Sequence, residues 1–210
     1  MDERLIVIVG YDTAELLDIA CVTTSLAMAN GIGNPALPYR VSVASPGGHP
    51  ITCGSGLTLQ SQQPLERLTG PLDTLIVSGG LGDERAAADP RLVGHVRRLA
   101  KESRRVASVC TGAGILAATG LLDGRRATTH WRHASQLAAQ HPEAMGDGVH
   151  CYDPDGTLIG RLDVPEAVAN ISWGGAKRNR LFIAAETSLY SVVMGVTGTH
   201  PTGPGRRPWL

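Results

Sequence analysis

Up to about residue 143, the sequence alternates short β-branched apolar runs with segments of helical periodicity. This alternation is typical of a parallel sheet covered by helices. The helix starts are marked, as at Asp89-Pro90, where a capping residue precedes a proline. The predicted strands are Arg4–Val9, Tyr39–Ser45, Thr74–Ser78, Val106–Cys110 and Ala127–Thr129, with a hairpin at Ile51–Leu59. The predicted helices are Glu15–Asn30, Pro90–Arg104, Gly112–Thr119 and a last one that ends near Gln140.

The pattern changes after Pro142, where only short strand-like runs follow, separated by turn sequences such as Asp153-Pro154-Asp155-Gly156. These runs are Val149–Tyr152, Thr157–Leu162, Val168–Trp173, Arg180–Ala185 and Ser188–Val196. We therefore expect an α/β domain over residues 1–145, an antiparallel β meander over 146–198 and a flexible tail over 199–210.

Charge and hydropathy narrow the classes of partner. The 19 Lys and Arg residues balance the 19 Asp and Glu residues, so the chain has no general basic surface for nucleic acid or an anionic membrane. The opening apolar run, Leu5–Val9, is far shorter than a membrane-spanning helix, and Met1-Asp2-Glu3 is acidic where a signal peptide is basic. We expect a cytoplasmic protein with a small-molecule substrate or ligand, and no nucleic-acid or membrane partner.

The four cysteines, Cys21, Cys53, Cys110 and Cys151, are widely scattered and form no C-x-x-C pair. A reducing compartment would leave all four as thiols.

Cys110 carries the strongest local signal. It ends a predicted buried strand and leads at once into Thr111-Gly112, the start of a predicted helix. Such an elbow holds a nucleophile in a strained position at the carboxyl edge of a parallel sheet, where the helix N-terminus favours thiolate. The alternative is a buried cysteine that closes a core strand.

Two further groups belong to the same sheet edge. The glycines Gly79 and Gly80 follow a strand, and their N–H groups could approach an oxyanion closely; a tight turn is the alternative. Asp18 lies within the apolar face of the first helix, where a carboxyl needs a partner and a nearby thiol would serve. Glu15 is the other candidate acid, although a solvated first-turn charge explains it more simply.

His130 ends the predicted strand Ala127–Thr129 and could reach the same edge. His133 follows three residues later, so the two histidines could bind a metal together with His141 or His150. Surface histidines explain His133, His141 and His150 more simply, so we expect neither a metal nor a cofactor.

From about Leu5 to Glu143 the sequence resembles the ThiJ/PfpI superfamily, whose fold is like that of class I glutamine amidotransferases. It is most similar to the branch with isonitrile hydratase and the amidase-like sensor domains of AraC-type regulators. The matching motifs are Leu17-Asp18-Ile19-Ala20, Val77-Ser78-Gly79-Gly80, Val109-Cys110-Thr111-Gly112 and the run from Gly120 to Trp131.

The resemblance implies a flavodoxin-like parallel sheet with helices on both faces. It also implies that Cys110 is the elbow cysteine, Asp18 the acid beside it and His130 a neighbouring histidine, with Gly79, Gly80 and Thr111 in the oxyanion loops. The chain departs from this branch at Cys21-Val22, where Gly-Pro is usual, and after residue 143, where further strands and a long helix are usual. The α/β domain is therefore expected to be truncated.

The segment from about Gly148 to Val196 resembles the last blade of six-bladed propellers of the gluconolactonase/regucalcin family, so the chain is expected to be chimeric. One blade cannot enclose a central metal channel, so no metal ligands are carried over. Open sheet edges would favour a homodimer.

The resemblance implies hydration or hydrolysis of a small electrophile by Cys110, as by a hydro-lyase or hydrolase. The open alternatives are a non-catalytic small-ligand sensor or interaction module, and a recombined product without selected activity.

Overall fold

The structure is a computed structural model that describes residues 3–33, 35–125, 127–141, 149–152, 158–164, 168–185 and 187–198. The chain divides into two compact units, residues 1–146 and 147–210, and each is described by itself.

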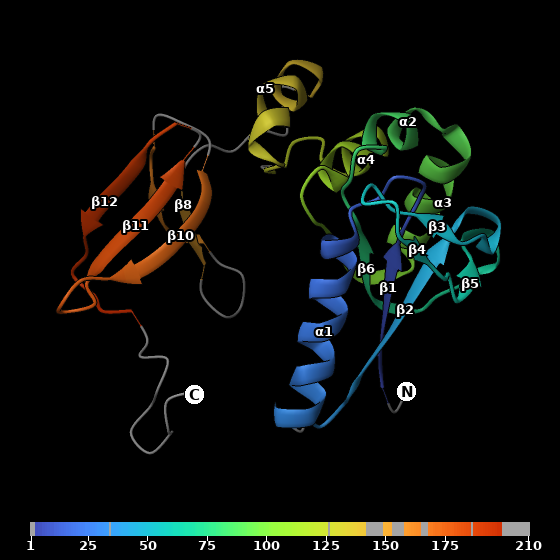
Figure 1. Cartoon of the computed structure of the whole chain (residues 1–210), viewed down its shortest axis with the longest axis horizontal. Helices are drawn as coiled ribbons and strands as arrows, with labels where there is room; N and C mark the ends of the chain where they lie inside the picture. The colour runs from blue at the N-terminus through green and yellow to red at the C-terminus, as the bar shows by residue number, and fades with distance from the viewer. Residues whose placement is uncertain are drawn as a thin grey trace. The chain divides into compact units, whose positions relative to one another are not determined.

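The first unit is built on a five-stranded sheet in the order β5-β2-β1-β6-β7 (Figure 1). All of its strand pairs are parallel, and β1 lies between β2 and β6 with Val7 opposite both Ser42 and Leu75. The order β2-β1-β6-β7 is that of flavodoxin-like sheets, which confirms the expected fold class. The strands are β1 (Arg4–Val9), β2 (Tyr39–Ser45), β5 (Gln63–Pro64), β6 (Leu72–Val77) and β7 (Ser103–Ser108).

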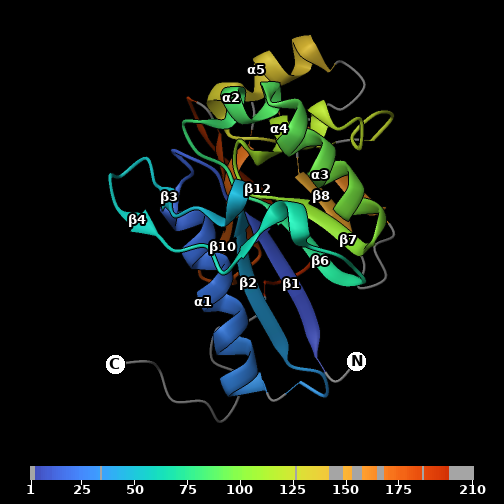
Figure 2. The same cartoon turned by 90° about the vertical axis from the view of Figure 1, so that its right-hand side faces the viewer.

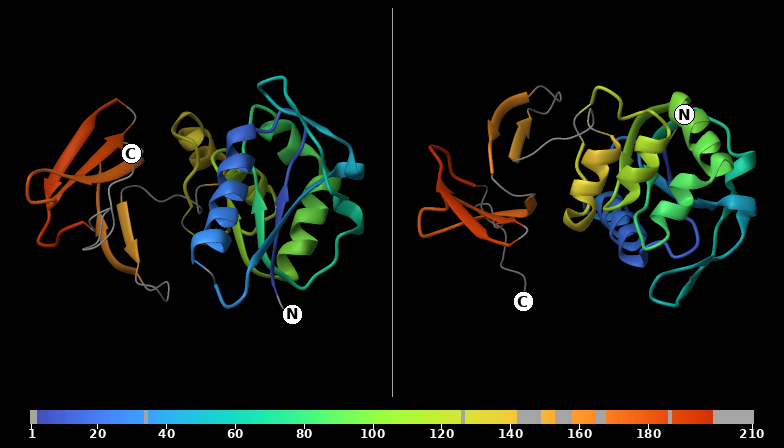
Figure 3. Two further views of the ribbon diagram at one scale, coloured as in Figure 1. Left: turned by 60° about the horizontal axis from the view of Figure 1, so that its bottom comes forward. Right: turned by 90° about the horizontal axis from the view of Figure 1, so that it is seen from above.

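Helices cover both faces of this sheet. In two views at right angles to each other, α1 (Leu16–Gly33) and α3 (Pro90–Lys101) lie on opposite sides of it (Figures 2 and 3). Asp89 caps α3, as expected, by accepting a hydrogen bond from the Arg91 N–H at 2.9 Å. The shorter helices are α2 (Asp83–Ala88), α4 (Gly112–Ala118) and α5 (Trp131–Gln140), with 3-10 turns at Pro46–Gly48 and Leu65–Arg67.

The core of the unit joins β1, β6 and the inner sides of α1 and α3. Val7, Leu75 and Leu99 are fully buried there, and Ile19 of α1 is 2% exposed. A central strand that is buried on both faces usually has a nearly continuous apolar sequence, as Leu5–Val9 does.

Several boundaries differ from the sequence prediction, most by one to three residues. The strand β7 begins at Ser103, inside the predicted helix Pro90–Arg104, because Glu102 caps the end of α3 and Ser103 already pairs with Leu72 of β6. It also ends at Ser108, so Cys110 lies past the strand. The residues Ala127–Thr129 form no strand of the sheet, whereas the predicted hairpin is confirmed as β3 (Ile51–Thr52) and β4 (Thr58–Leu59).

The second unit contains only strands among its described residues, in agreement with the expected antiparallel meander. β8 (Val149–Tyr152) pairs with β9 (Leu158–Leu162), and β11 (Arg180–Ala185) pairs with β10 (Val168–Gly174) and β12 (Leu189–Val193). Leu181 and Ile183 of β11 are buried in a small core of its own. The turn Asp153–Gly156, the join at residues 142–148 and the expected tail at 199–210 lie outside the described residues.

Among the described helices, α1 is long and apolar enough to cross a membrane when judged by length and composition alone. One side of α1 packs against the sheet through Leu16, Ile19 and Leu26, and only 6% of the helix is buried inside the structure.

Candidate functional site at the carboxyl edge of the sheet

Cys110 lies in the turn between β7 and α4 and has a positive φ of 52°. This left-handed conformation is uncommon for a residue other than glycine and marks a strained position. The Val109 N–H still pairs with the Val77 carbonyl at 3.0 Å, and the Gly112 N–H pairs with the Val109 carbonyl at 3.0 Å. These bonds hold the elbow on the sheet edge at which β6 also ends.

Gly79 brings Asp18 and Cys110 together. Its N–H donates to Asp18 Oδ2 at 3.0 Å. A Cβ on Gly79 would lie 2.6 Å from Asp18 Oδ2 and 2.8 Å from the Cys110 Cβ. Those two atoms are therefore at most 5.4 Å apart, the sum of the two distances. The residues are 92 positions apart in the sequence, yet they meet across one glycine that has no side chain to separate them.

Thr111 joins the same arrangement through Gly80. Its hydroxyl oxygen accepts from the Gly80 N–H at 2.9 Å and donates to the Gly80 carbonyl at 3.1 Å. On the other side of the elbow, Thr129 Oγ1 donates to the Cys110 carbonyl at 3.1 Å. The loop after β6, the elbow and the segment before α5 are thus tied together by threonine hydroxyls.

The glycine loop is organised differently from the expected oxyanion loop. The N–H groups of Gly79 and Gly80 already donate to Asp18 and Thr111, so they position these side chains instead of facing an empty site. The Thr111 N–H is hydrogen-bonded to the Cys110 thiol and lowers its pKa.

The electrostatics of the elbow also differ from the expectation of a stabilised thiolate. Burial, and next to it the charge of Asp18, raises the pKa of the Cys110 thiol, and this outweighs the Thr111 N–H, which lowers it. Burial likewise raises the pKa of the Asp18 carboxyl, while the Gly79 N–H and then His130 act in the opposite direction. The charge of Asp18 therefore favours the protonated Cys110 thiol, whereas the neighbouring charge that raises the pKa of Asp18 itself is that of Glu15.

His130 lies close enough to Asp18 to lower the pKa of that carboxyl. Its Nδ1 caps α5 by accepting from the Arg132 N–H at 3.3 Å, and its ring contacts that of His133 edge to face, with centroids 6.1 Å apart. No group of three His, Cys, Asp or Glu side chains in the described part of the chain could hold a metal ion.

The four cysteines differ in exposure. All four cysteines are free; Cys53 is buried, whereas Cys21 and Cys151 are exposed and Cys110 is half-buried.

Two side chains near the elbow are missing from the sequence prediction. Tyr11 is buried, its hydroxyl donates to the Ser78 carbonyl at 3.0 Å, and Asp18 and Cys110 both act on its ionisation. Asp83 follows the glycine loop and acts on the pKa of Cys110. Tyr11 lies just past the carboxyl end of β1. Because ligands bind at the carboxyl ends of parallel strands, the sequence could have predicted Tyr11 as a site residue.

The fold and site define a class of α/β proteins, with a flavodoxin-like sheet, a strained elbow cysteine and a carboxylate beside it. Residues 3–159 match the DJ-1/PfpI family, and the chain belongs to this family. The match extends past residue 145, where the sequence predicted the α/β domain to end, into β8 and β9.

Three relatives show the range of the family. The chain is 38% identical over 137 residues to an uncharacterized protein in the cpoL 5' region of Streptomyces lividans, which covers 65% of this chain and 94% of that protein. It is 40% identical over 88 residues to isonitrile hydratase of Pseudomonas putida (42% of this chain, 38% of the relative). It is 36% identical over 105 residues to the HTH-type transcriptional regulator CdhR of Pseudomonas aeruginosa (50% and 31%). The chain therefore spans less than half of the length of the hydratase and of the regulator.

Solved structures share the fold. A THiJ/PfpI family protein from Pseudomonas syringae matches with a TM-score of 0.61 at 22% identity, over 75% of this chain and 62% of that one. DJ-1beta of Drosophila melanogaster matches with a TM-score of 0.58 at 18% identity, over 74% and 80%. None of the matches described here supports the expected resemblance of Gly148–Val196 to a propeller blade.

Proposed function

We propose that this protein acts on a small electrophilic substrate by hydration or hydrolysis, with Cys110 as nucleophile and Asp18 as its acid–base partner. The observation that carries the proposal is the placement of the two side chains on either side of Gly79, at most 5.4 Å apart between Asp18 Oδ2 and the Cys110 Cβ. The similarity to isonitrile hydratase supports a substrate with a carbon–nitrogen multiple bond, and amide-like substrates are the related case.

The raised pKa values suit proton transfer within this pair. A thiol that is protonated at neutral pH needs a base at the moment of attack, and a carboxylate whose pKa is raised accepts the proton more readily. In the first step on an isonitrile, the S–H proton moves to Asp18, sulfur bonds to the terminal carbon, and Asp18 gives the proton to the electron pair of that carbon, which leaves a thioimidate with a C=N bond. On an amide, the carbonyl electron pair moves onto oxygen and then returns as the amine leaves with the proton from Asp18, which leaves a thioester.

Water completes the reaction in the second step. It adds to the carbon of the thioimidate, the C=N electron pair moves onto nitrogen, and nitrogen takes one water proton. The hydroxyl then becomes the carbonyl of the product and gives its proton to Asp18, as the C–S bond breaks with its electron pair on sulfur. The sulfur takes the proton back from Asp18, so the net change is addition of one water molecule. The Thr111 N–H lies beside the reacting sulfur, where it would stabilise charge on the first intermediate.

A ligand-sensing role is the second candidate. Two observations favour it: the relatives include HTH-type regulators, and the pKa of the Cys110 thiol is raised where many cysteine nucleophiles have a lowered one. A sensor would bind a small ligand at this site without reacting with it.

The experiment compares turnover by matched cysteine variants. A short aliphatic isonitrile and a short aliphatic amide are incubated with the wild type, Cys110→Ser and Cys21→Ser, and product is followed by proton NMR. We expect the wild type and Cys21→Ser to turn over one of them and Cys110→Ser to lose about a hundredfold or more, as for removal of a nucleophile. Turnover retained by Cys110→Ser, or absent from the wild type, would contradict the catalytic proposal.

Homodimer formation and a cytoplasmic location remain part of the proposal. Leu17, Met28 and Ile32 of α1 are exposed, which supports association of two copies. Sedimentation velocity tests it, and a monomer at micromolar concentration would contradict it. That residues 146–198 are a recruited structural segment is likewise proposed.

A further inference from the structure

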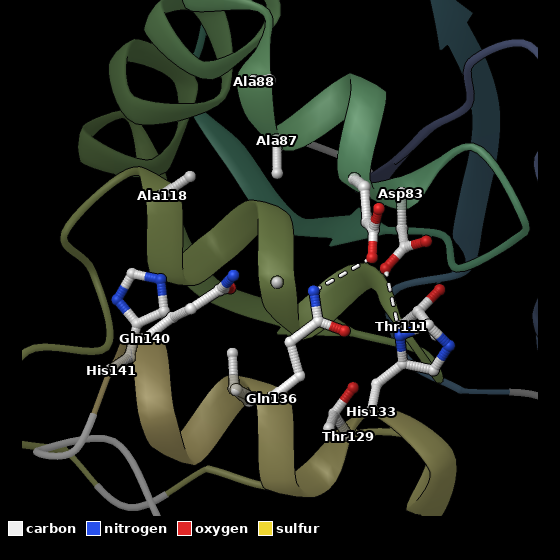
Figure 4. A pocket seen from close by; sticks show the side chains of 13 residues that line it. Asp83, Ala87, Ala88, Thr111, Ala118, Thr129, His133, Gln136, Gln140 and His141 are labelled. Atoms are coloured by element: carbon white, nitrogen blue, oxygen red, sulfur yellow. Dashed lines mark hydrogen bonds and ion pairs between the residues drawn. The ribbon is translucent and has the colours of Figure 1, made fainter.

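A cavity of about 350 Å³ lies in the first unit between α2, α4 and α5 (Figure 4). Cys110 does not line it, but its neighbour Thr111 and the elbow-binding Thr129 do. Its volume is at the small end of the range for ligand pockets, about 300–1,000 Å³.

Carboxylates on one wall set the charge of this cavity. Asp83 and Glu84 of α2 face α5, where His133 Nδ1 lies 3.8 Å from Asp83 Oδ2 and the Gln136 amide donates to Glu84 at 2.9 Å (Figure 4). Of the described residues that line the cavity, none is a lysine or an arginine. The lining therefore carries two negative charges when His133 and His141 are neutral, and no net charge when both are protonated.

Asp83 is the buried charge of this wall. It is only 8% exposed, and burial raises the pKa of its carboxyl, while His133 and then the backbone N–H groups of Glu84 and Asp83, which donate to the carboxylate, act in the opposite direction. The nearest histidine nitrogen, His133 Nδ1, lies 3.8 Å away, which is longer than a hydrogen bond, so the charge of Asp83 can still accept a cationic donor from the cavity. An ammonium group in the cavity would provide a closer partner than His133 does.

The rest of the lining selects among cations. Gln136 and Gln140 add amide oxygens and Thr111 adds a hydroxyl oxygen, so the polar wall is rich in acceptors. No phenylalanine, tyrosine or tryptophan is among its described lining residues, so the aromatic cage that quaternary ammonium ions prefer is missing. Small apolar side chains, Ala87 and Ala118, leave room for a short aliphatic chain.

We propose that the cavity between α2, α4 and α5 is a binding site for a compact primary ammonium ion with a short aliphatic chain. The charge of Asp83 and Glu84 holds the ammonium group, and the alanines of α2 and α4 contact the chain. The site goes beyond the chemistry proposed for Cys110 and does not depend on it.

The probe is n-butylammonium chloride, titrated into the full chain by calorimetry, with 1-butanol, sodium butyrate and tetramethylammonium chloride as matched comparisons. We expect saturable one-to-one binding of n-butylammonium, with the three comparisons weaker by about tenfold or more, since each lacks the charge or the N–H donors. Equal binding of any comparison, or no saturable binding of n-butylammonium, would overturn the proposal.

Variants locate the binding site. Glu84→Gln and Asp83→Asn should each weaken binding by about tenfold, and Ala118→Leu should abolish it by filling the cavity. Asp123→Asn removes the same charge from an exposed position outside the cavity and should bind like the wild type. Because Asp83 is buried, circular dichroism first checks that Asp83→Asn is folded, and Glu84→Gln and Ala118→Leu keep the test decisive if it is not.

Cys110→Ser separates this proposal from the catalytic one. It should bind n-butylammonium within about twofold of the wild type even though turnover is lost. If Asp123→Asn or Cys110→Ser weakens binding as much as Glu84→Gln does, the ammonium ion is bound elsewhere and the site is wrong.

Discussion

The Asp18 carboxylate accepts a hydrogen bond from the Gly79 N–H at 3.0 Å, and both Asp18 Oδ2 and the Cys110 Cβ lie within 2.8 Å of the position that a Cβ on Gly79 would take. One backbone position therefore fixes both the acid and the thiol of the candidate site. Any side chain at residue 79 would separate the two groups.

Gly79→Ala tests this packing. The added Cβ would lie 2.8 Å from the Thr111 backbone nitrogen as well as close to Asp18 and Cys110, so backbone must shift. We expect the free energy of unfolding to fall by about 1–3 kcal/mol in urea titrations. Gly94→Ala is the matched control: nothing lies within 4 Å of the new Cβ, and alanine in a helix should stabilise by about 0.5–1 kcal/mol. Equal effects of the two substitutions would show that residue 79 is not constrained.

Thr111→Val tests the hydroxyl that holds the glycine loop. Valine keeps the shape of the buried threonine but leaves the Gly80 N–H without its acceptor. We expect a loss of about 1–3 kcal/mol in the free energy of unfolding. Thr111→Ser retains the hydroxyl and should lose clearly less. If the serine variant is as unstable as the valine variant, the methyl group and not the hydrogen bond matters.

Tyr11 makes the free energy of unfolding depend on pH in the alkaline range. Burial, and next to it the charge of Asp83, raises the pKa of its phenol above the ordinary value of about 10. The folded state therefore holds this proton more tightly than the unfolded state. The stability that it contributes is full below pH about 10 and is lost as the pH rises beyond that value.

Tyr11→Phe checks this pH dependence in urea titrations from pH 8 to 11. At pH 8 the variant should be about 1 kcal/mol less stable, because the hydrogen bond to the Ser78 carbonyl is gone. Towards pH 11 the gap between variant and wild type should close. A gap that stays constant over this range would show that Tyr11 does not ionise on unfolding.

Much of the first unit could be predicted from the sequence because its signals are local. The apolar run Leu5–Val9 and the cap at Asp89 each determine their own element, and β2 was predicted with its observed bounds, Tyr39–Ser45. The predicted end of α3 was wrong because Ser103 pairs with Leu72 of β6, a contact between distant segments that the helical charge pattern does not report.

The site could be predicted only in part, since its geometry depends on contacts between distant segments. The elbow at Cys110 is a local motif of consecutive residues, so the sequence could predict it. The structure places Asp18 beside it. That the N–H groups of Gly79 and Gly80 are already occupied depends on how the loop meets α1 and α4 in space. The direction of the pKa shift of Cys110 depends on burial and on Asp18, neither of which a local motif reports.

Asp18 controls the ionisation of the Cys110 thiol, and the pH dependence of Cys110 alkylation in Asp18→Asn measures that control. Rates with limiting iodoacetamide are measured for each cysteine peptide by mass spectrometry from pH 6 to 10, so that the exposed Cys21 and Cys151 serve as internal references. Asparagine can still accept the Gly79 hydrogen bond but removes the charge that raises the pKa of the thiol. We expect the alkylation profile of Cys110 to move to lower pH in Asp18→Asn, with Cys21, Cys151 and the Asp123→Asn control unchanged. An unchanged Cys110 profile, or one that moves to higher pH, would contradict this control of the thiol by Asp18.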